Sequence, residues 1–270
     1  MTLNRPAKPA TAARIYDYLL GGTHNFPADR EAAETIIAMF PRTRMAAQVN
    51  RAFLRRTVRF LCRQGLTQFL DIGSGIPTEG NVHEIAQETE PKARVVYVDI
   101  DPVAVAESQE MLEHNEFALA IHGNAREPRS IVEHPMVRKV IDFDKPVGVL
   151  LAALLHFIGD DDEARTIVKL LLEAMPSGSY LVISHVVDET TPDYVQSEDV
   201  RRVHEVYRKQ TSSMLRLRTR AEIEQYFEGL ELLEPGVVWL TDWRQEPDDP
   251  IPAEDDVAYY VAAGGVGRKP

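Results

Sequence analysis

The sequence predicts an α/β fold with a mostly parallel sheet and helices on both of its faces. Two observations carry this prediction. Between residues 68 and 187, short apolar segments alternate with amphipathic ones, which is the pattern of right-handed βαβ units. The segment Val147–Leu154 is apolar throughout apart from Gly148, as expected of a strand that is buried on both faces in the middle of a parallel sheet.

Composition narrows the class of protein. The chain has 270 residues, of which 44% are hydrophobic and 27% charged, a mix typical of one large globular domain. The formal net charge of −12 argues against a general nucleic-acid binder, which normally carries a basic footprint. The single cysteine, Cys62, excludes an intramolecular disulfide and a zinc site built on several cysteines, and we interpret it as a buried core thiol. We assign no metal site.

The N-terminus gives no sign of export. Met1–Ala13 lacks the apolar core of a signal peptide, and the longest apolar run is too short to span a bilayer. We therefore expect a cytoplasmic protein without a membrane partner.

Two helices are expected before the first strand. We expect residues 1 to about 12 to form a disordered lead-in. Asp29 is placed to cap a helix over Glu31–Met39, and Pro41 breaks it. A longer helix from about Thr43 to Gln64 follows, with apolar residues at helical spacing and Gly65 at its C-terminal end. Its opposite face is basic, and we interpret it as solvated, with binding of an anionic substrate or partner as the alternative: Arg51, Arg55, Arg56, Arg59 and Arg63.

The alternating region is assigned element by element. The expected strands are Gln68–Ile72, Arg94–Asp99, Ala118–His122, Val147–Leu154 and Tyr180–Val187. The expected helices between them are Asn81–Glu88, which begins with a capping-box spacing of Asn81 and Glu84, then Pro102–His114, Ser130–Val137, and a helix capped by Asp160 that ends at Met175.

The pattern changes after residue 187. Ser197–Leu217 is expected to be a polar helix that serves either as a substrate cover or as the contact of a homodimer. Thr219 and Glu222 have capping-box spacing and start a helix to Phe227. Val237–Leu240 and Val257–Ala262 are expected as two closing strands, with a loose tail from Gly264.

The first candidate ligand-binding segment is the glycine-rich turn within Phe69–Thr78. The first strand ends with Asp71, and Gly73, Ser74 and Gly75 follow it. Glycine allows a sharp turn and a close approach of the backbone to a ligand, and ligands of open α/β sheets bind beyond the carboxyl ends of strands. The alternative is a plain connection between strand and helix that happens to need glycine.

Three further positions lie at the same edge of the expected sheet. Asp99 ends the second strand and could accept hydrogen bonds from both ribose hydroxyls of an adenosine, with Ile100 against the adenine face. Asp101 is placed to cap the next helix, with Pro102 at its first position. Capping by both aspartates is the alternative. Asn124, after the third strand, could read the adenine edge, or lie in a simple turn.

A dinucleotide cofactor is the competing interpretation. The nicotinamide dinucleotide fingerprint needs a third glycine where Thr78 stands. The acidic Asp71 before the first glycine fits a nucleoside cofactor without a pyrophosphate better. No phosphate-binding loop of the Walker A type is present.

Taken together, these segments resemble the class I S-adenosylmethionine-dependent methyltransferases. The resemblance rests on Asp71-x-Gly73-x-Gly75, Asp99, Gly123-Asn124-Ala125 and Leu154–Phe157. More narrowly, nearly the whole chain resembles a family of actinomycete methyltransferase-like proteins long classed as a domain of unknown function. This match is carried by Arg14–Arg30, Asn50–Leu54 and Asp71–Glu84.

The resemblance implies a Rossmann-like seven-stranded, mostly parallel sheet whose last strand is antiparallel. It also implies S-adenosylmethionine as cofactor and an acceptor that the family leaves undefined. The methionine half of the cofactor and the acceptor would meet after the fourth strand. One departure concerns Pro77, which stands where many class I enzymes have a third glycine, and it leaves the contacts of the loop open. The expected cofactor-binding residues are Asp71, Gly73, Ser74, Gly75, Asp99, Ile100, Asp101, Asn124, Ala125 and Leu154.

The N-terminal signature has two interpretations. Its polar side chains surround Gly21-Gly22 and form either a turn between two short helices or a lid over the cofactor. We divide the chain into an N-terminal helical extension or lid, residues 1–66, and an α/β domain, residues 67–270. An oxygen or nitrogen acceptor needs a general base within hydrogen-bond reach, and the candidates are His156, His24 and Tyr16, with His156 expected nearest the methyl group.

The predicted function is transfer of a methyl group to a small-molecule acceptor. The alternatives are a cofactor-binding regulatory or scaffold protein without catalysis, and an NAD-dependent oxidoreductase.

Overall fold

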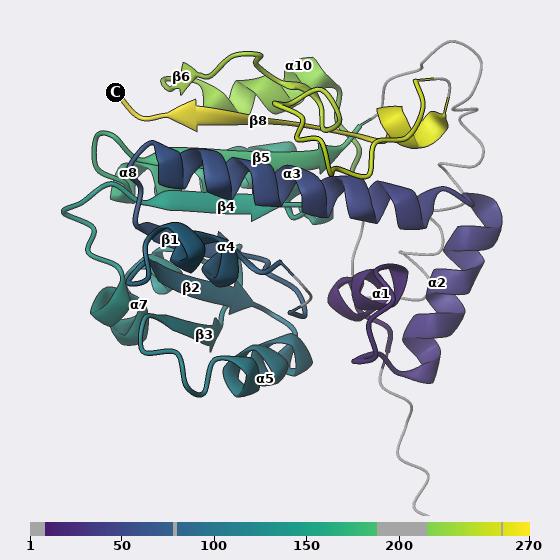
Figure 1. The fold of residues 1–270 in the computed structure, drawn as a ribbon, viewed down its shortest axis with the longest axis horizontal. Coiled ribbons are helices and arrows are strands. Elements are labelled where there is room, and N and C mark those ends of the chain that lie inside the picture. Colours follow the sequence, from purple (N-terminus) through teal and green to yellow (C-terminus); the bar gives the residue numbers. More distant parts are fainter. Residues whose placement is uncertain (1–8, 78–79, 188–214, 255) are drawn as a thin grey trace, which may run out of the picture.

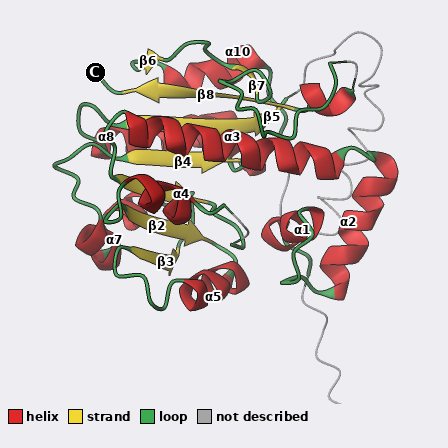
Figure 2. Ribbon diagram, in the orientation of Figure 1, coloured by secondary structure: helices red, strands yellow, loops and turns green. Residues whose placement is uncertain are grey.

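The computed structural model describes residues 9–77, 80–187, 215–254 and 256–270. These residues form an eight-stranded sheet of order β3-β2-β1-β4-β5-β8-β6, with β7 also paired to β8. The first five strands are mutually parallel and β8 runs antiparallel to β5, as Figures 1 and 2 show. The strands are β1 Gln68–Ile72, β2 Arg94–Asp99, β3 Ala118–His122, β4 Gly148–Ala152, β5 Tyr180–Val186, β6 Glu231–Leu232, β7 Val238–Trp239 and β8 Ala262–Arg268.

The predicted fold class is confirmed, and the number of strands is corrected from seven to eight. The edge strand that pairs with β8 is interrupted. Its first part, β6, pairs with Gly267–Arg268 and its second part, β7, pairs with Ala263–Gly264. Between them the chain turns at Gly236, whose φ is +92° and whose N–H donates to the Leu233 carbonyl. The expected strand Val237–Leu240 corresponds to β7, and β6 is an additional strand that was not predicted.

Helices cover both faces of the sheet and its carboxyl edge. In Figure 1, α3 crosses the front of the sheet along β4 and β5, and α1 and α2 stand beyond the carboxyl ends of these strands. The α-helices are α1 Ala12–Leu19, α2 Pro27–Met39, α3 Thr43–Arg63, α4 Val82–Thr89, α5 Pro102–Met111, α6 Pro128–Val132, α7 Pro135–Val140, α8 Asp161–Ala174 and α10 Arg220–Glu224. The 3-10 helices are η1 Leu155–Phe157, η2 Gln225–Phe227 and η3 Val257–Tyr260.

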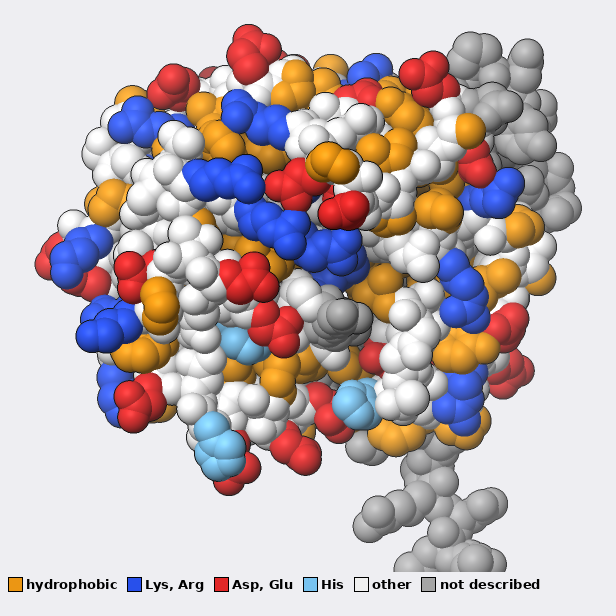
Figure 3. All heavy atoms as spheres, in the orientation of Figure 1, with side chains coloured by type: hydrophobic (Ala, Val, Ile, Leu, Met, Phe, Trp, Pro, Cys, Tyr) orange, Lys and Arg blue, Asp and Glu red, His pale blue; other side chains and the backbone are white. Residues whose placement is uncertain are grey.

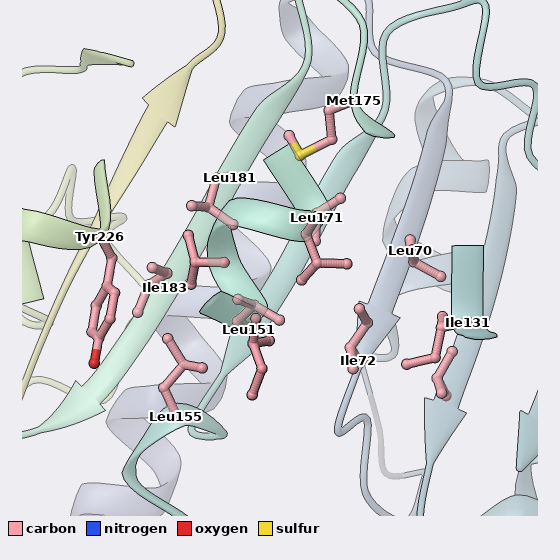
Figure 4. Packing of buried hydrophobic residues seen from close by; sticks show 14 of the residues in the cluster. Leu70, Ile72, Ile131, Leu151, Leu155, Leu171, Met175, Leu181, Ile183 and Tyr226 are labelled. Atoms are coloured by element: carbon pink, nitrogen blue, oxygen red, sulfur yellow. The ribbon is translucent and has the colours of Figure 1, made fainter. Parts of the chain in front are cut away.

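The sheet separates two apolar cores, and a third, smaller one joins α1 to α2. One core packs β-strand residues against α6, α7, α8 and α10. Figure 4 shows part of this cluster, including Leu151, Ile183 and the α8 residue Leu171. The other packs the opposite face against α3 and α4. Because α3 belongs to this second core, it packs on the sheet, and among the described helices α1 and α2 form a separate cluster beside it.

The basic face of α3 is only partly solvated. Figure 3 shows Lys and Arg side chains in a stripe across the face that α3 covers. Arg56, however, is buried and donates to the carbonyls of Trp243 (3.0 Å) and Leu240 and to Asp249 (2.6 Å). Burial lowers the pKa of Arg56, and Asp249 opposes this. Arg56 therefore anchors the segment before η3 to α3, in place of the solvated role expected.

Three expected helices differ in extent. The helix expected to begin at Glu31 starts at Pro27, because Asp29 accepts the N–H of Phe26 (2.8 Å) from the third helical position. Ser130–Val137 is two helices, since Pro135 starts α7 and His134 caps it. Residues 215–217 are not helical, and the rest of the expected Ser197–Leu217 helix lies outside the described residues.

The predicted bounds of the C-terminal strand were wrong. Val257–Tyr260 is a 3-10 helix, and the strand begins at Ala262 and includes the tail that was expected to be loose. Glycine in this strand meets a packing requirement. A Cβ at Gly264 would lie 2.6 Å from the Ile183 carbonyl oxygen and 2.7 Å from Leu240. None of the described helices is long and apolar enough to cross a membrane.

Candidate functional site

A cavity of about 960 Å³ lies at the carboxyl ends of β1, β2, β4 and β5, with α1, α2 and α3 forming its opposite wall. Strand order reverses between β1 and β4, so the cavity is at the switch point where open α/β sheets bind ligands. Its size is at the upper end of the range for small-molecule sites, about 300–1,000 Å³. All ten expected cofactor-binding residues line it, and so do Tyr16 and His156.

His24 is the exception. Its side chain is 47% exposed and pairs with Glu107 on α5, with 3.4 Å between Nδ1 and Oε2. His24 does not line the cavity. The structure therefore does not bring the three candidate bases together, and a catalytic role for His24 has no geometric support.

The glycine turn follows β1 as expected. The N–H groups of Gly73 and Ser74 both donate to the Val98 carbonyl, at 2.7 and 3.2 Å. Gly73 and Gly75 have φ of +73° and +68°, a region that favours glycine. A Cβ on Gly73 would lie 2.6 Å from Leu154 Cδ1. Backbone conformation and close packing thus both require glycine at position 73.

Asp99 supports this turn from the neighbouring strand. Its Oδ2 accepts the N–H of Gly75 (2.7 Å) and its Oδ1 accepts that of Asp101 (2.8 Å). Each carboxylate oxygen can accept a second donor, so the side chain can still receive two hydroxyls. Burial raises the pKa of Asp99, and the two backbone donors oppose the rise. Ile100 beside it is 60% exposed and gives the cavity an apolar surface that a flat ring can cover.

Asp101 caps α5 and also anchors the N-terminal segment. Its Oδ1 accepts the N–H of Val103 (2.9 Å). Its Oδ2 accepts from Arg14 Nη1 (2.9 Å) and Thr11 Oγ1 (2.5 Å). Arg14 also pairs with the buried Asp29 (2.9 Å). This network, which includes residues that the sequence prediction did not single out, holds α1 and α2 against the start of α5 at the cavity wall.

Asp71 lies buried below the glycine turn. Burial raises its pKa to about 7, Arg51 on α3 opposes the rise, and Asp99 adds to it. Cross-strand pairing places Asp71 beside Tyr97. Tyr97 in turn accepts the N–H of His83 and contacts its ring, both at 2.8 Å. Asp71 is therefore a carboxyl group that changes charge near neutral pH at the wall of the cavity.

Tyr16 belongs to a chain of hydrogen bonds that links α1, α3 and β5. Its hydroxyl donates to the Ala47 carbonyl (3.0 Å) and accepts from Asn50 Nδ2 (2.9 Å). Asn50 Oδ1 accepts from Ser184 Oγ (2.5 Å). Burial raises the pKa of Tyr16. The proton of Tyr16 is thus held by a backbone carbonyl, which favours positioning over proton abstraction.

His156 lies in η1, immediately after β4. It is buried, and its pKa is well below the usual value because of burial first and of His185 and Arg218 second. Its Nδ1 accepts the N–H of Val186 at 3.4 Å, so the hydrogen of the neutral ring is on Nε2. His156 is therefore neutral at physiological pH, and in this tautomer it offers a donor.

Arg218 fixes the loop that carries His156. The buried guanidinium donates to the carbonyls of Leu155 (3.0 Å) and Ile158 (2.9 Å), on either side of His156. It also contacts His185 Nε2 (3.0 Å), and burial lowers the pKa of His185 to about 4. The sequence offered no signal for Arg218 other than its place before the Thr219 cap.

A family model described as S-adenosyl methyltransferase matches residues 5–270, whereas no curated protein matches. The chain is similar to a presumed methyltransferase from Thermobifida fusca YX, with 37% identity, a TM-score of 0.87, and coverage of 100% of this chain and 99% of that one. It is also similar to a DUF574 family protein from Streptomyces avermitilis MA-4680, with 39% identity, a TM-score of 0.89, and coverage of 97% and 98%.

A more distant structure, PigF with SAH, shares the fold. It is 17% identical, with a TM-score of 0.52, and the match covers 96% of this chain and 63% of that one.

Proposed function

Because the chain belongs to the S-adenosyl methyltransferase family and is an S-adenosylmethionine-dependent methyltransferase, we propose that it methylates a small, mostly apolar acceptor inside the cavity. The observation that carries this proposal is the division of the cavity wall. The side at β1 and β2 presents carboxylates, a glycine turn and one exposed apolar side chain. The side formed by α1, α2 and η1 is mainly apolar.

The cofactor is proposed to occupy the side at β1 and β2. Asp99 would receive the ribose hydroxyls and Ile100 the adenine face, with Asn124 and Ala125 at the adenine edge. The glycine turn leaves room for the backbone to approach the cofactor closely. When bound, the cofactor supplies the electrophilic methyl group, so the work of the protein is to align the acceptor and exclude water.

The acceptor is proposed to occupy the other side. Asp71, Asp99 and Asp101 are the carboxylates among the described lining residues, and all three belong to the cofactor side. A cationic acceptor would find no carboxylate among the described residues of the apolar side, and Arg42 on that side is already paired with Asp256 (3.1 Å), so a neutral molecule fits better. The net charge of −12 likewise disfavours a nucleic acid. The apolar side is lined by Leu19, Ile36, Met39, Phe40, Phe157, Leu217 and Tyr260.

Calorimetric titration tests the cofactor side. The wild-type protein is expected to bind S-adenosylmethionine and S-adenosylhomocysteine in the micromolar range and NAD not at all. Asp99→Ala should abolish this binding, because it removes the ribose acceptor and the support of the Gly75 N–H. The control is Asp162→Ala on α8, where the carboxylate is almost fully exposed. Binding of NAD alone would overturn the proposal.

His156 is proposed to contact the acceptor. Once a panel of neutral hydroxyl, amino and thiol compounds yields an acceptor, His156→Ala should lower kcat/KM by about 10-fold, because it removes the Nε2–H that holds the acceptor in place. The affinity for S-adenosylhomocysteine should stay unchanged. Unchanged turnover would remove His156 from the reaction. If the protein binds the cofactor but methylates no compound of the panel, a regulatory role gains weight.

Three further proposals rest on the sequence. They are a cytoplasmic location, a homodimer, and a lid. Since α3 packs on one face of the sheet, the lid is proposed to consist of α1 and α2 alone. The ion pair between Arg14 and Asp101 holds this lid against the α/β domain.

A further inference from the structure

Arg51 lines the cavity, and one of its guanidinium nitrogens has no hydrogen-bond partner among the described residues. It lies on α3 in the turn beside Asn50 and lines the cavity wall. Its Nη2 donates to the Gly80 carbonyl at 3.2 Å, which fixes the side chain at the end of the glycine loop. Its Nε is buried without a hydrogen-bond partner. A buried donor without an acceptor is costly, so this group indicates an acceptor that a ligand supplies.

Asp71 faces the same space with the opposite charge. Both residues also line a small recess behind the glycine turn, together with Ser74 and Gly75. The charge of Arg51 opposes the rise in the pKa of Asp71, which shows that the two groups interact. No ion pair within 4.0 Å joins them in the described part of the chain. A positive and a negative group that face one cavity without pairing suit a ligand that carries both charges.

We propose that Arg51 binds the α-carboxylate of the cofactor, opposite Asp71, which takes its α-ammonium group. This inference rests on the proposed placement of the cofactor. Guanidinium and carboxylate are well matched in geometry and charge. Fixing the amino-acid end of the cofactor would restrict the position of its sulfonium group relative to the acceptor.

A bound ammonium group would favour the charged form of Asp71, whose pKa burial raises to about 7 despite the charge of Arg51. The groups that face Asp71 are Arg51 on α3 and Asp99 and Tyr97 on β2.

The test compares two ligands that differ only in the α-carboxylate. S-adenosylmethionine and decarboxylated S-adenosylmethionine are titrated calorimetrically into wild-type, Arg51→Gln and Arg51→Lys proteins. Wild type should bind S-adenosylmethionine about 10- to 100-fold more tightly than the decarboxylated ligand. Arg51→Gln should bind both about equally, with its affinity for the decarboxylated ligand unchanged. Arg51→Lys should keep part of the preference, because lysine retains the charge but loses the planar fork.

Arg55→Gln is the matched control. Arg55 is one turn further along α3, and its side chain also lies against Gly80, but it does not line the cavity. This variant should keep the full preference for S-adenosylmethionine. An equal loss for both ligands in Arg51→Gln would mean that Arg51 holds the glycine loop and not the carboxylate, and would overturn the inference. Failure of the wild-type protein to bind either ligand would overturn the placement of the cofactor itself.

Discussion

Gly264→Ala is expected to lower the free energy of unfolding by about 3 kcal/mol, within the range for overpacking a core. Gly264 lies in the middle of β8, paired with Ser184 of β5. The new Cβ would lie 2.6 Å from the Ile183 carbonyl oxygen, 2.7 Å from Leu240 and 3.0 Å from Phe53. The Ile183 carbonyl cannot move without breaking the hydrogen bonds between β5 and β8, so the substitution should distort the pairing of these two strands.

Gly265→Ala is the matched control in the same strand. There the nearest atoms would be Val237 Cγ2 at 3.2 Å and the Gly236 carbonyl at 3.3 Å, distances that small shifts can absorb. We expect this variant to lose no more than about 1 kcal/mol. Urea unfolding followed by circular dichroism measures both values. Equal stability of the two variants would show that the C-terminal strand yields easily, as a loose tail would.

The close contacts of the β8 glycines explain why strands β1 to β5 could be predicted from the sequence and β8 could not. The strands from β1 to β5 are indicated by apolar segments of the sequence, and β1, β2 and β3 have the expected bounds. In β8 the sequence Ala-Ala-Gly-Gly-Val-Gly-Arg lacks the branched and aromatic residues that favour strands. Its glycines reflect close contacts with β5, α3 and the segment after α10, and these contacts exist only once the sheet is built.

The site, too, contains residues that could be predicted from the sequence and residues that could not. The glycine turn and Asp99 could be predicted because a strand, a turn and an acidic residue are neighbours in the sequence. Arg14 reaches Asp101 from 87 residues away, and Ser184 reaches Asn50 from 134 residues away. Such pairs form only when α1 lies against the start of α5 and α3 packs against the sheet. Arg51 was visible only as one arginine of a basic helix face, and its place at the cavity depends on the rotation of α3.

Asp71→Asn is expected to stabilise the protein in the absence of cofactor. The folded protein holds the proton of Asp71 up to about pH 7, whereas an unfolded chain releases it near pH 4. Between these values the folded state binds more protons, so its stability falls as the pH rises. Asparagine is neutral throughout and avoids this loss. The variant should gain on the order of 3 kcal/mol at pH 8 and almost nothing at pH 4.

Asp101→Asn should have the opposite effect, although both carboxyl groups are 4% exposed and line the same cavity. Asp101 carries a partner, Arg14, at 2.9 Å, and removing its charge leaves a buried guanidinium with Asp29 alone. Asparagine still caps α5, so the expected loss of about 1–3 kcal/mol reports on the ion pair.

Thermal unfolding at pH 4 and pH 8, without and with S-adenosylhomocysteine, separates the two aspartates. The ligand should stabilise wild type more than Asp71→Asn, because the carboxylate offers the α-ammonium group a negative charge, whereas the amide oxygen of asparagine is a neutral acceptor. A protein optimised for stability alone would not keep an unpaired carboxyl group buried at position 71. If Asp71→Asn destabilised the empty protein as Asp101→Asn is expected to do, Asp71 would have to be charged and paired before the cofactor arrives.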